Sequence, residues 1–339
     1  MMGPFIIVVV IWILAYYLVA QWAKGGQCTS MARLDGKTVL ITGANTGIGR
    51  ETALDLASRG ADVHILCRDQ KKGKAAAEVI EKIVGKEVTV HSLDVSCLES
   101  VRECVKEITA KLSKIDILIN NAGVMACPLT KTKDGFELQL ATNHLGPFLL
   151  TLELLPLIRK GKNPRIVTVS SLAHKTGKIY FEDINFASIP YKPFKAYNQS
   201  KLANILFTRE LARRELDAGS GVTANCLHPG VVKTELSRYK HHTLSAGVFH
   251  YLTQVMMAPF FKTPESGAQT TIFCAVDEAL EGVTGKYFAD CKEVETAQVA
   301  KNMDDAARLW DESLKMVKKN QMIMNKFKLF NFVSRSILE

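Results

Sequence analysis

The sequence lacks the signals by which several protein classes are recognised. Its eight cysteines form no C-x-x-C pair and show no metal-like spacing with the histidines, so we expect neither a metal site nor a disulfide scaffold. Reduced, mostly buried thiols in a reducing compartment are expected instead. No Pro/Gly/Ser-rich linker, internal repeat or low-complexity tract interrupts residues 35–310, which predicts one domain, over residues 35–312.

Acidic residues are in deficit: 34 Asp and Glu oppose 43 Lys and Arg, for a formal net charge of +9. The basic residues are scattered or in small clusters, and no nucleic-acid-binding motif accompanies them. A dinucleotide phosphate or an anionic membrane surface would use the excess. We therefore predict no nucleic-acid partner.

Charged residues are missing between residues 1 and 23, and the stretch from Phe5 to Val19 is almost purely apolar. A helix rises ~1.5 Å per residue, so this stretch is long enough for a hydrocarbon core of roughly 30 Å. Aromatic residues gather toward its far end, as at a membrane interface: Trp12, Tyr16, Tyr17 and Trp22. We predict a transmembrane anchor over residues 1–23, followed by a linker over residues 24–34.

A cleavable signal peptide is the alternative, but no basic residue precedes the apolar run and no small-x-small cleavage site follows it. Lys24, Arg33 and Lys37 come after the run, so the positive-inside rule places the large domain in the cytosol. The only glycosylation sequon begins at Asn198, inside the motif discussed below, which fits a domain that never enters the lumen. We expect a single-pass protein of the endoplasmic reticulum membrane.

Short apolar runs alternate with helical periods through the main body. The first run, from Lys37 to Thr42, precedes a helical stretch from Gly47 to Arg59 that Gly60 closes. Further strand-like runs cover residues 63–67, 88–93, 115–120, 165–170 and 223–228. Strict alternation of this kind predicts an α/β fold: a doubly wound, Rossmann-like parallel sheet with helices on both faces.

A glycine-rich turn follows the first strand and opens the first helix. Glycines there allow the backbone to approach a pyrophosphate, whose charge the helix N-terminus favours. The predicted cofactor-binding residues of this turn are Gly43, Asn45, Thr46, Gly47, Ile48 and Gly49. Arg50 is a second candidate phosphate contact, although arginines are also common on helix surfaces.

The ends of the next strands carry further candidates. Cys67 stands where an NAD-preferring enzyme usually has a carboxylate, and Arg68 follows it, which favours NADP(H) over NAD. Asp94 would contact the adenine or cap the next helix. Asn121, Ala122 and Gly123 follow the fourth strand, and small residues at this edge suit a close-lying cofactor.

Tyr197 and Lys201 are spaced by one helical turn, so their side chains share a helix face. An adjacent ammonium would lower the pKa of the phenol toward neutrality and suit it to proton transfer. A surface pair with no catalytic role is the alternative explanation for this spacing.

Together these motifs resemble the short-chain dehydrogenase/reductase superfamily over residues 35–290. The motifs are Thr-Gly-x3-Gly-x-Gly, Asn-Asn-Ala-Gly, and Tyr-x3-Lys preceded by Ser170-Ser171. Asn143-His-Leu-Gly, Ser-Ser-x-Ala-His and Ser-Lys-Leu-Ala-Asn resemble the membrane-anchored retinol dehydrogenases in particular, as does the apolar N-terminus.

The resemblance implies a role for each motif residue. Tyr197 would be the general acid or base, and Lys201 would hold the nicotinamide ribose and lower the pKa of the tyrosine. Ser171 would bind the substrate oxygen, with Ser170 as the alternative that finishes a strand. Asn143 would hold a water that completes a proton relay to Lys201. Three residues would bracket the nicotinamide carboxamide: Pro229, Gly230 and Thr234.

Two further stretches remain open. Residues 244–261 are rich in large apolar side chains and would form a lid over a lipophilic substrate, or an ordinary packed helix or dimer face. Residues 313–339 form a basic amphipathic tail that would touch a membrane or lie free.

We expect an enzyme that interconverts retinal and retinol with NADP(H). The first alternative is an enzyme that reduces steroids or lipid-derived aldehydes, and a weaker alternative is a noncatalytic scaffold with this fold. The sequence leaves open whether the protein forms a homo-oligomer.

Overall fold

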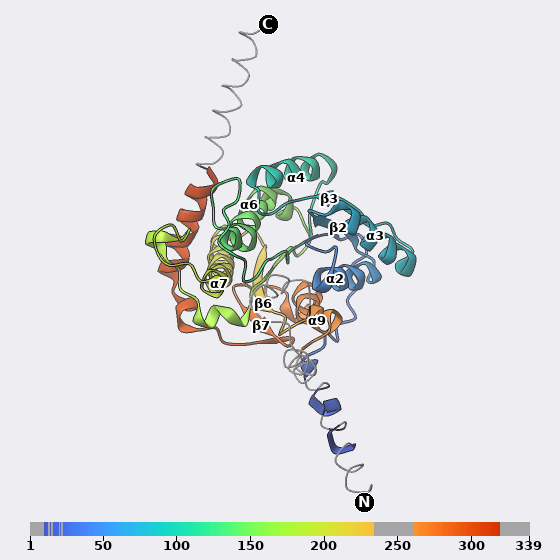
Figure 1. Ribbon diagram of the computed structural model, residues 1–339. Coiled ribbons are helices and arrows are strands. Elements are labelled where there is room, and N and C mark those ends of the chain that lie inside the picture. The colour runs from blue at the N-terminus through green and yellow to red at the C-terminus, as the bar shows by residue number, and fades with distance from the viewer. Residues whose placement is uncertain are drawn as a thin grey trace, which may run out of the picture.

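A computed structural model describes residues 10–12, 14, 16–19, 21, 23–233 and 261–318 (Figure 1). Its centre is an eight-stranded sheet in the order β3-β2-β1-β4-β5-β6-β7-β8. Neighbouring strands are parallel except for the last pair, β7 and β8. The strands are β1 (Thr38–Thr42), β2 (Asp62–Cys67), β3 (Thr89–Ser92), β4 (Ile117–Asn120), β5 (Arg165–Val169), β6 (Thr223–His228), β7 (Tyr287–Ala289) and β8 (Lys292–Glu293).

Helices cover both faces of this sheet, as the alternating pattern predicted (Figure 1). One layer consists of α2 (Gly47–Ser58), α3 (Gln70–Val84) and α9 (Pro264–Val276). The other consists of α4 (Leu98–Lys111), α6 (Gly146–Ile158) and α7 (Pro193–Asp217). Val39 and Ile41 of β1 point into the first layer and Leu40 into the second, because successive side chains of a strand alternate between its faces.

Shorter helical segments connect these elements. They are α5 (Leu138–Leu140), the π-helix η1 (Ala141–Leu145), and the 3-10 helices η2 (Leu172–Thr176), η3 (Phe181–Asp183), η6 (Glu278–Leu280) and η7 (Gln298–Lys301). A further helix covers residues 303–318. All eight cysteines lie in the described part of the chain and all are free thiols, as expected.

The six predicted strands are present with shifts of at most two residues at either end. β1, for example, begins at Thr38 rather than Lys37, and β4 at Ile117 rather than Ile115. Helix α2 ends at Ser58, one residue early, and Gly60 takes the left-handed conformation with φ +95°. The sequence pattern did not predict β7 and β8, because strands of two or three residues are too short to show a period.

Residues 24–34, which we predicted as a linker, are hydrogen-bonded to the folded domain. From Gly25 onward the chain lies across α9 and α2 and is hydrogen-bonded to both. The helix over residues 303–318 likewise continues past the expected domain end at 312. Ser313 and Val317 are buried in it, so the packed body extends into residues that we had assigned to the tail.

Three expectations fall on residues outside the described parts of the chain: much of the predicted anchor, nearly all of the predicted lid, and the tail from residue 319 onward. Within the described parts, none of the helices has the length and apolar character that a membrane span needs.

Candidate active site

A cleft of about 320 Å³ opens at the carboxyl edge of the sheet. It lies where the strand order reverses between β1 and β4, the usual ligand position in an open α/β sheet. Nearly every predicted site residue lines it: Gly43, Asn45, Thr46, Gly47, Ile48, Gly49, Arg68, Asp94, Asn121, Ala122, Gly123, Ser171, Tyr197, Lys201, Pro229 and Gly230. Residues from segments far apart in the sequence therefore form one site.

The glycine-rich turn has the backbone geometry that its composition predicted. Gly43 and Gly47 take positive φ values of +67° and +58°, where a side chain would be strained. Thr46, the N-cap residue of α2, makes no side-chain cap hydrogen bond to any described residue. The first N–H groups of α2 are thus left for a ligand, and a phosphate is the group that such a helix terminus favours.

Asn121 supports this turn from the next strand. Its Nδ2 donates to the carbonyl oxygens of Thr42 at 2.8 Å and Gly43 at 3.3 Å. A Cβ on Gly49 would lie only 2.5 Å from the same nitrogen, so this glycine allows close packing. The asparagine therefore shapes the cradle, and the turn, the helix terminus and the cleft together have the features that a dinucleotide cofactor needs.

Arg68 and Asp94 meet at the end of the cleft beside β2 and β3, where the motifs predict the adenosine of the cofactor. Arg68 is 66% exposed, and its Nη1 lies 3.7 Å from Oδ2 of Asp94. Asp94 does not cap α4: its Oδ1 accepts from Ser96, while Asp134 accepts the N–H of Leu98 at 2.9 Å. The cap interpretation of Asp94 was wrong, because the helix begins four residues after it.

Lys72 also lines this end of the cleft, although no sequence motif marks it. It lines the cleft from the first turn of α3, and Asp69 caps that helix by accepting from the N–H of Lys72 at 3.0 Å. Arg50, the second candidate phosphate contact, pairs with Glu51 at 2.6 Å and is not among the residues that line the cleft.

Helix α7 carries Tyr197 and Lys201 into the other end of the cleft. Both are buried, with 5% and 3% of their surface exposed, so they are not a surface pair. The hydroxyl of Tyr197 is hydrogen-bonded to Ser171. Nζ of Lys201 donates to the carbonyl oxygen of Val169 at 3.0 Å and lies 5.7 Å from the centre of the Tyr197 ring.

The expected direction of the pKa shift of Tyr197 was wrong. Burial raises the pKa of Tyr197 to about 12, and the hydrogen bond to Ser171 opposes this rise only in part. Burial also lowers the pKa of Lys201 to about 8. Desolvation outweighs the attraction between the two groups because the lysine nitrogen contacts a carbonyl rather than the phenol oxygen.

The two serines before η2 have different partners. Ser170 is buried, and its hydroxyl donates to the main-chain oxygen of Lys201 at 2.7 Å. Ser171 is partly exposed and reaches Tyr197. Ser171 is thus the serine whose hydroxyl is available beside the phenol, whereas Ser170 attaches β5 to α7.

Asn143 lies behind the site rather than in its lining. It belongs to the π-helix η1, and its Nδ2 donates to Ser200 Oγ and to the carbonyl of Val124, both at 2.9 Å. A Cβ on Gly123 would meet Asn143 Oδ1 at 3.2 Å and Lys201 Nζ at 3.7 Å, so these side chains come close only because residue 123 is a glycine. A π-turn in this position is typical of functional sites.

The segment after β6 completes the wall. Gly230 has φ +87°, and its N–H donates to Nδ1 of His228 at 3.0 Å. Pro229 and Gly230 line the cleft, whereas Thr234 lies outside the described residues. Leu138 is an apolar lining residue that carried no motif, and only the fold brings it here.

Comparisons with known proteins agree with this geometry. Residues 37–245 match the family described as short chain dehydrogenase. Human retinol dehydrogenase 12 is 47% identical over 306 residues, covering 89% of this chain and 94% of that protein. Human retinol dehydrogenase 13 is 46% identical over 308 residues, covering 89% and 91%.

A solved structure of an uncharacterised protein from Mycobacterium paratuberculosis is also similar. It has a TM-score of 0.70 and 38% identity, and the match covers 87% of this chain and 98% of that one. The family match covers residues 37–245, and the relatives named above match over 87–89% of this chain. The chain belongs to the short chain dehydrogenase family of oxidoreductases.

Proposed function

We propose that this enzyme interconverts retinal and retinol with NADP(H). The observation that carries the proposal is the contact between Ser171 and Tyr197 at one end of a cleft whose other end has a phosphate-binding turn. Two hydroxyl groups there converge on the position of a single substrate oxygen. The similarity to retinol dehydrogenases supports a retinoid as the substrate.

The nicotinamide ring, when bound, supplies or accepts the hydride. The protein supplies the proton: in carbonyl reduction the phenol of Tyr197 donates it to the substrate oxygen, and Ser171 donates a hydrogen bond to that oxygen. With a pKa of about 12, Tyr197 is fully protonated at neutral pH, as a general acid must be. No covalent bond to the serine is needed.

Lys201 then stabilises the tyrosinate that this transfer leaves. Its pKa of about 8 keeps most of the side chain charged at neutral pH. The lysine also holds the nicotinamide ribose hydroxyls in this proposal, and Asn143 orients a water that returns a proton toward Lys201. The fixed hydrogen bonds of Asn143 to Val124 and Ser200 support a positioning role for η1.

The charge at the adenosine end supports NADP(H). Arg68 and Lys72 both line the cleft there. Cys67, the last residue of β2, has a thiol where an NAD-preferring enzyme usually has a carboxylate. The carboxylate of Asp69 accepts the helix-cap hydrogen bond from the N–H of Lys72. A ribose 2′-phosphate would therefore meet two cations in this region.

We also propose that the apolar N-terminus anchors the enzyme in the endoplasmic reticulum membrane with the catalytic domain in the cytosol. The support is the uncharged N-terminal stretch, the basic residues that follow it, and the free state of all eight cysteines. A membrane location suits a lipophilic substrate.

Steady-state kinetics on the full-length protein in lipid vesicles test this function. Retinal, a steroid ketone and a medium-chain aldehyde would each be offered with NADPH and with NADH. We expect the highest kcat/KM for retinal with NADPH. A steroid or the medium-chain aldehyde as best substrate would reject the retinoid assignment, and equal rates with NADH would reject the cofactor assignment.

A further inference from the structure

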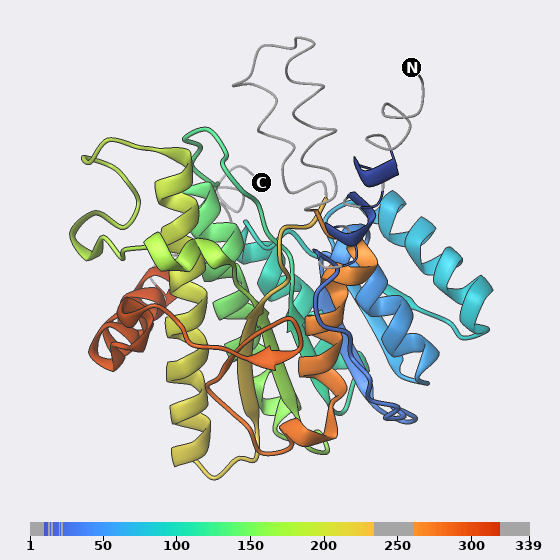
Figure 2. The same cartoon turned by 90° about the horizontal axis from the view of Figure 1, so that it is seen from below.

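The segment from residue 25 to residue 35, here called the strap, runs along the catalytic domain from the carboxyl ends of the parallel strands to their amino ends. It begins beside Asp290, which follows the carboxyl end of β7. It ends where the N–H of Leu34 donates to the carbonyl of Arg59 at 2.9 Å, just before β1. In Figure 2 this blue segment follows the orange helix α9 along its length.

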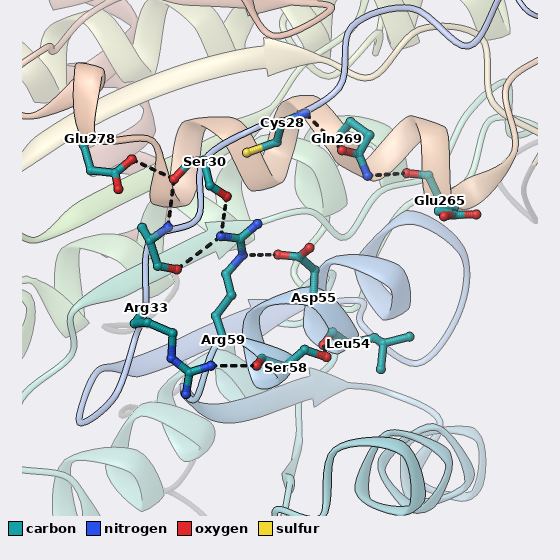
Figure 3. Close-up of polar contacts among 11 residues, drawn as sticks. Cys28, Ser30, Arg33, Leu54, Asp55, Ser58, Arg59, Glu265, Gln269 and Glu278 are labelled. Atoms are coloured by element: carbon teal, nitrogen blue, oxygen red, sulfur yellow. Dashed lines mark hydrogen bonds and ion pairs between the residues drawn. The ribbon is translucent and has the colours of Figure 1, made fainter.

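Side chains of both neighbouring helices hold the strap (Figure 3). Nη1 of Arg59 donates to the carbonyl oxygens of Ser30 at 2.8 Å and Ala32 at 3.1 Å. Gln269 of α9 accepts the N–H of Cys28 at 3.1 Å, and Glu278 accepts the hydroxyl of Ser30 at 2.7 Å. These bonds lie between residues far apart in sequence, so the strap is part of the folded domain.

The start of the strap packs too closely for any residue larger than glycine. A Cβ on Gly26 would lie 1.9 Å from the main-chain oxygen of Asp290, and one on Gly25 would lie 2.6 Å from Nζ of Lys262. Lys262 is only 7% exposed and pairs with Asp290 at 2.5 Å. The chain therefore enters the domain at a fixed point.

That entry point adjoins the active-site cleft. A Cβ on Gly230, which lines the cleft, would lie 2.8 Å from Cε of Lys262, so one lysine side chain separates the strap from the cleft wall. Two apolar residues flank this lysine on the surface. Val231 is 59% exposed and Phe261 is 39% exposed, and the N–H of Lys262 donates to the carbonyl of Val231 at 2.8 Å.

The chain that leads into the strap is itself apolar and uncovered. Six large apolar side chains of its described part are more than half exposed: Val10, Ile11, Trp12, Leu14, Tyr17 and Leu18. Exposed apolar side chains thus lie both in the described part of residues 10–18 and beside the mouth of the cleft, and both surfaces suit contact with a lipid bilayer.

We propose that the strap is a rigid mount that fixes the mouth of the cleft against the membrane surface, with Val231 and Phe261 in contact with lipid. The proposal rests on the membrane anchor proposed above. It adds that the orientation of the catalytic domain is set by the docked strap and is not left to a flexible tether. A lipophilic substrate would then pass from the bilayer to the cleft without crossing water.

Photocrosslinking of the full-length protein in phosphatidylcholine vesicles that contain a photoactivatable phospholipid tests this mount. We expect lipid adducts on peptides that contain Val231 and Phe261, in addition to adducts within residues 10–23. A flexible Gly/Ser insertion of about ten residues between Lys24 and Gly25 would add a reach of roughly 17 Å. It should lower the adducts at Val231 and Phe261 by about fivefold or more and leave those at residues 10–23 unchanged.

The matched control carries the same insertion between Gly85 and Lys86, two exposed residues between α3 and β3 at the opposite edge of the sheet. It should keep the wild-type adduct pattern, and equal Tm values would show that both variants are folded. Unchanged adducts after the first insertion, or wild-type adducts confined to residues 10–23, would overturn the mount. Crosslinks between two copies at Val231 or Phe261 would overturn it as well. Because the readout needs no substrate, a failed retinal assay would leave it intact.

Discussion

The Nδ1 nitrogen of His174 lies 2.8 Å from the main-chain carbonyl oxygen of Ser171. On the other side of the ring, Nε2 accepts the N–H of Ala297 at 3.2 Å. The two bonds require a neutral imidazole with its proton on Nδ1, and burial lowers the pKa of this histidine accordingly. His174 therefore ties the backbone of Ser171 to the C-terminal part of the fold.

Replacement of His174 by Phe should lower kcat by roughly tenfold to a hundredfold, because the loss of buried hydrogen bonds costs about 1–3 kcal/mol and releases Ser171. The KM for the cofactor should stay near the wild-type value, since the phosphate-binding turn is remote from the ring. His174→Asn keeps a donor near Ser171 and should restore part of kcat. A rise in the cofactor KM with kcat unchanged would contradict this role.

Tyr197→Phe should reduce turnover by about 10²-fold to 10⁴-fold, because the variant keeps the ring and loses the proton donor. Cofactor affinity, measured by the quenching of protein fluorescence, should change little. Tyr191→Phe is the matched control: Tyr191 is half-buried and its hydroxyl donates to the carbonyl oxygen of Cys127 at 2.8 Å, outside the cleft lining. Substantial activity in Tyr197→Phe would show that another group donates the proton.

Retinal reduction should decline as the pH rises through about 8. Above that value Lys201 loses the charge that stabilises tyrosinate, while Tyr197, with a pKa of about 12, stays protonated. Retinol oxidation should instead rise with pH up to about 8 and then level off, because it needs the deprotonated phenol, which the charged Lys201 stabilises. In Lys201→Arg the cation persists to higher pH, so the decline in reduction should move upward even if the rate is lower. A decline that stays near pH 8 in this variant would assign it to another group.

Arg68→Gln should lower kcat/KM with NADPH by about tenfold, the effect of one lost charge-assisted hydrogen bond at an exposed position. The value with NADH should be nearly unchanged, because NADH carries no 2′-phosphate. Arg50→Gln is the control, since Arg50 pairs with Glu51 outside the cleft. Equal losses with both cofactors would mean that Arg68 supports the fold rather than the phosphate.

Gly26→Ala should detach the start of the strap, because the added methyl group would overlap the main-chain oxygen of Asp290. Overpacking of this kind costs about 1–3 kcal/mol and should lower Tm by roughly 2–6 °C. Trypsin should cleave faster after Lys24 and Arg33. Gln27→Ala, at an exposed neighbouring position, is the control. Wild-type cleavage rates in Gly26→Ala would show that the strap accommodates the added methyl group without detaching.

The motifs of this chain predicted the fold well because each is a local pattern. A buried parallel strand needs a short apolar run, and the phosphate turn needs glycines at Gly43 and Gly47, so both are legible in a few consecutive residues. The positions of Lys72 and Leu138 in the lining of the cleft could not be predicted in this way. They reach the cleft only because α3 and α5 pack beside it.

The role of residues 24–34 shows the same limit more clearly. The residues were predicted as a linker, and nothing in their sequence specifies the hydrogen bonds to Arg59 and Gln269. Those partners lie 29 and 241 residues away along the chain, so only the folded arrangement makes the segment a rigid strap.

The sequence by itself determined the doubly wound architecture, the position of the dinucleotide turn and the pairing of Tyr197 with Lys201 on one helix face. Periodicity and local backbone demands suffice for all three. Only the tertiary structure shows how Asn143 is held and that burial raises the pKa of Tyr197 rather than lowering it. It also shows that Ser171, the serine that the resemblance implied, is the one that meets the tyrosine. These properties depend on desolvation and on contacts between distant segments, and neither exists until the chain has packed.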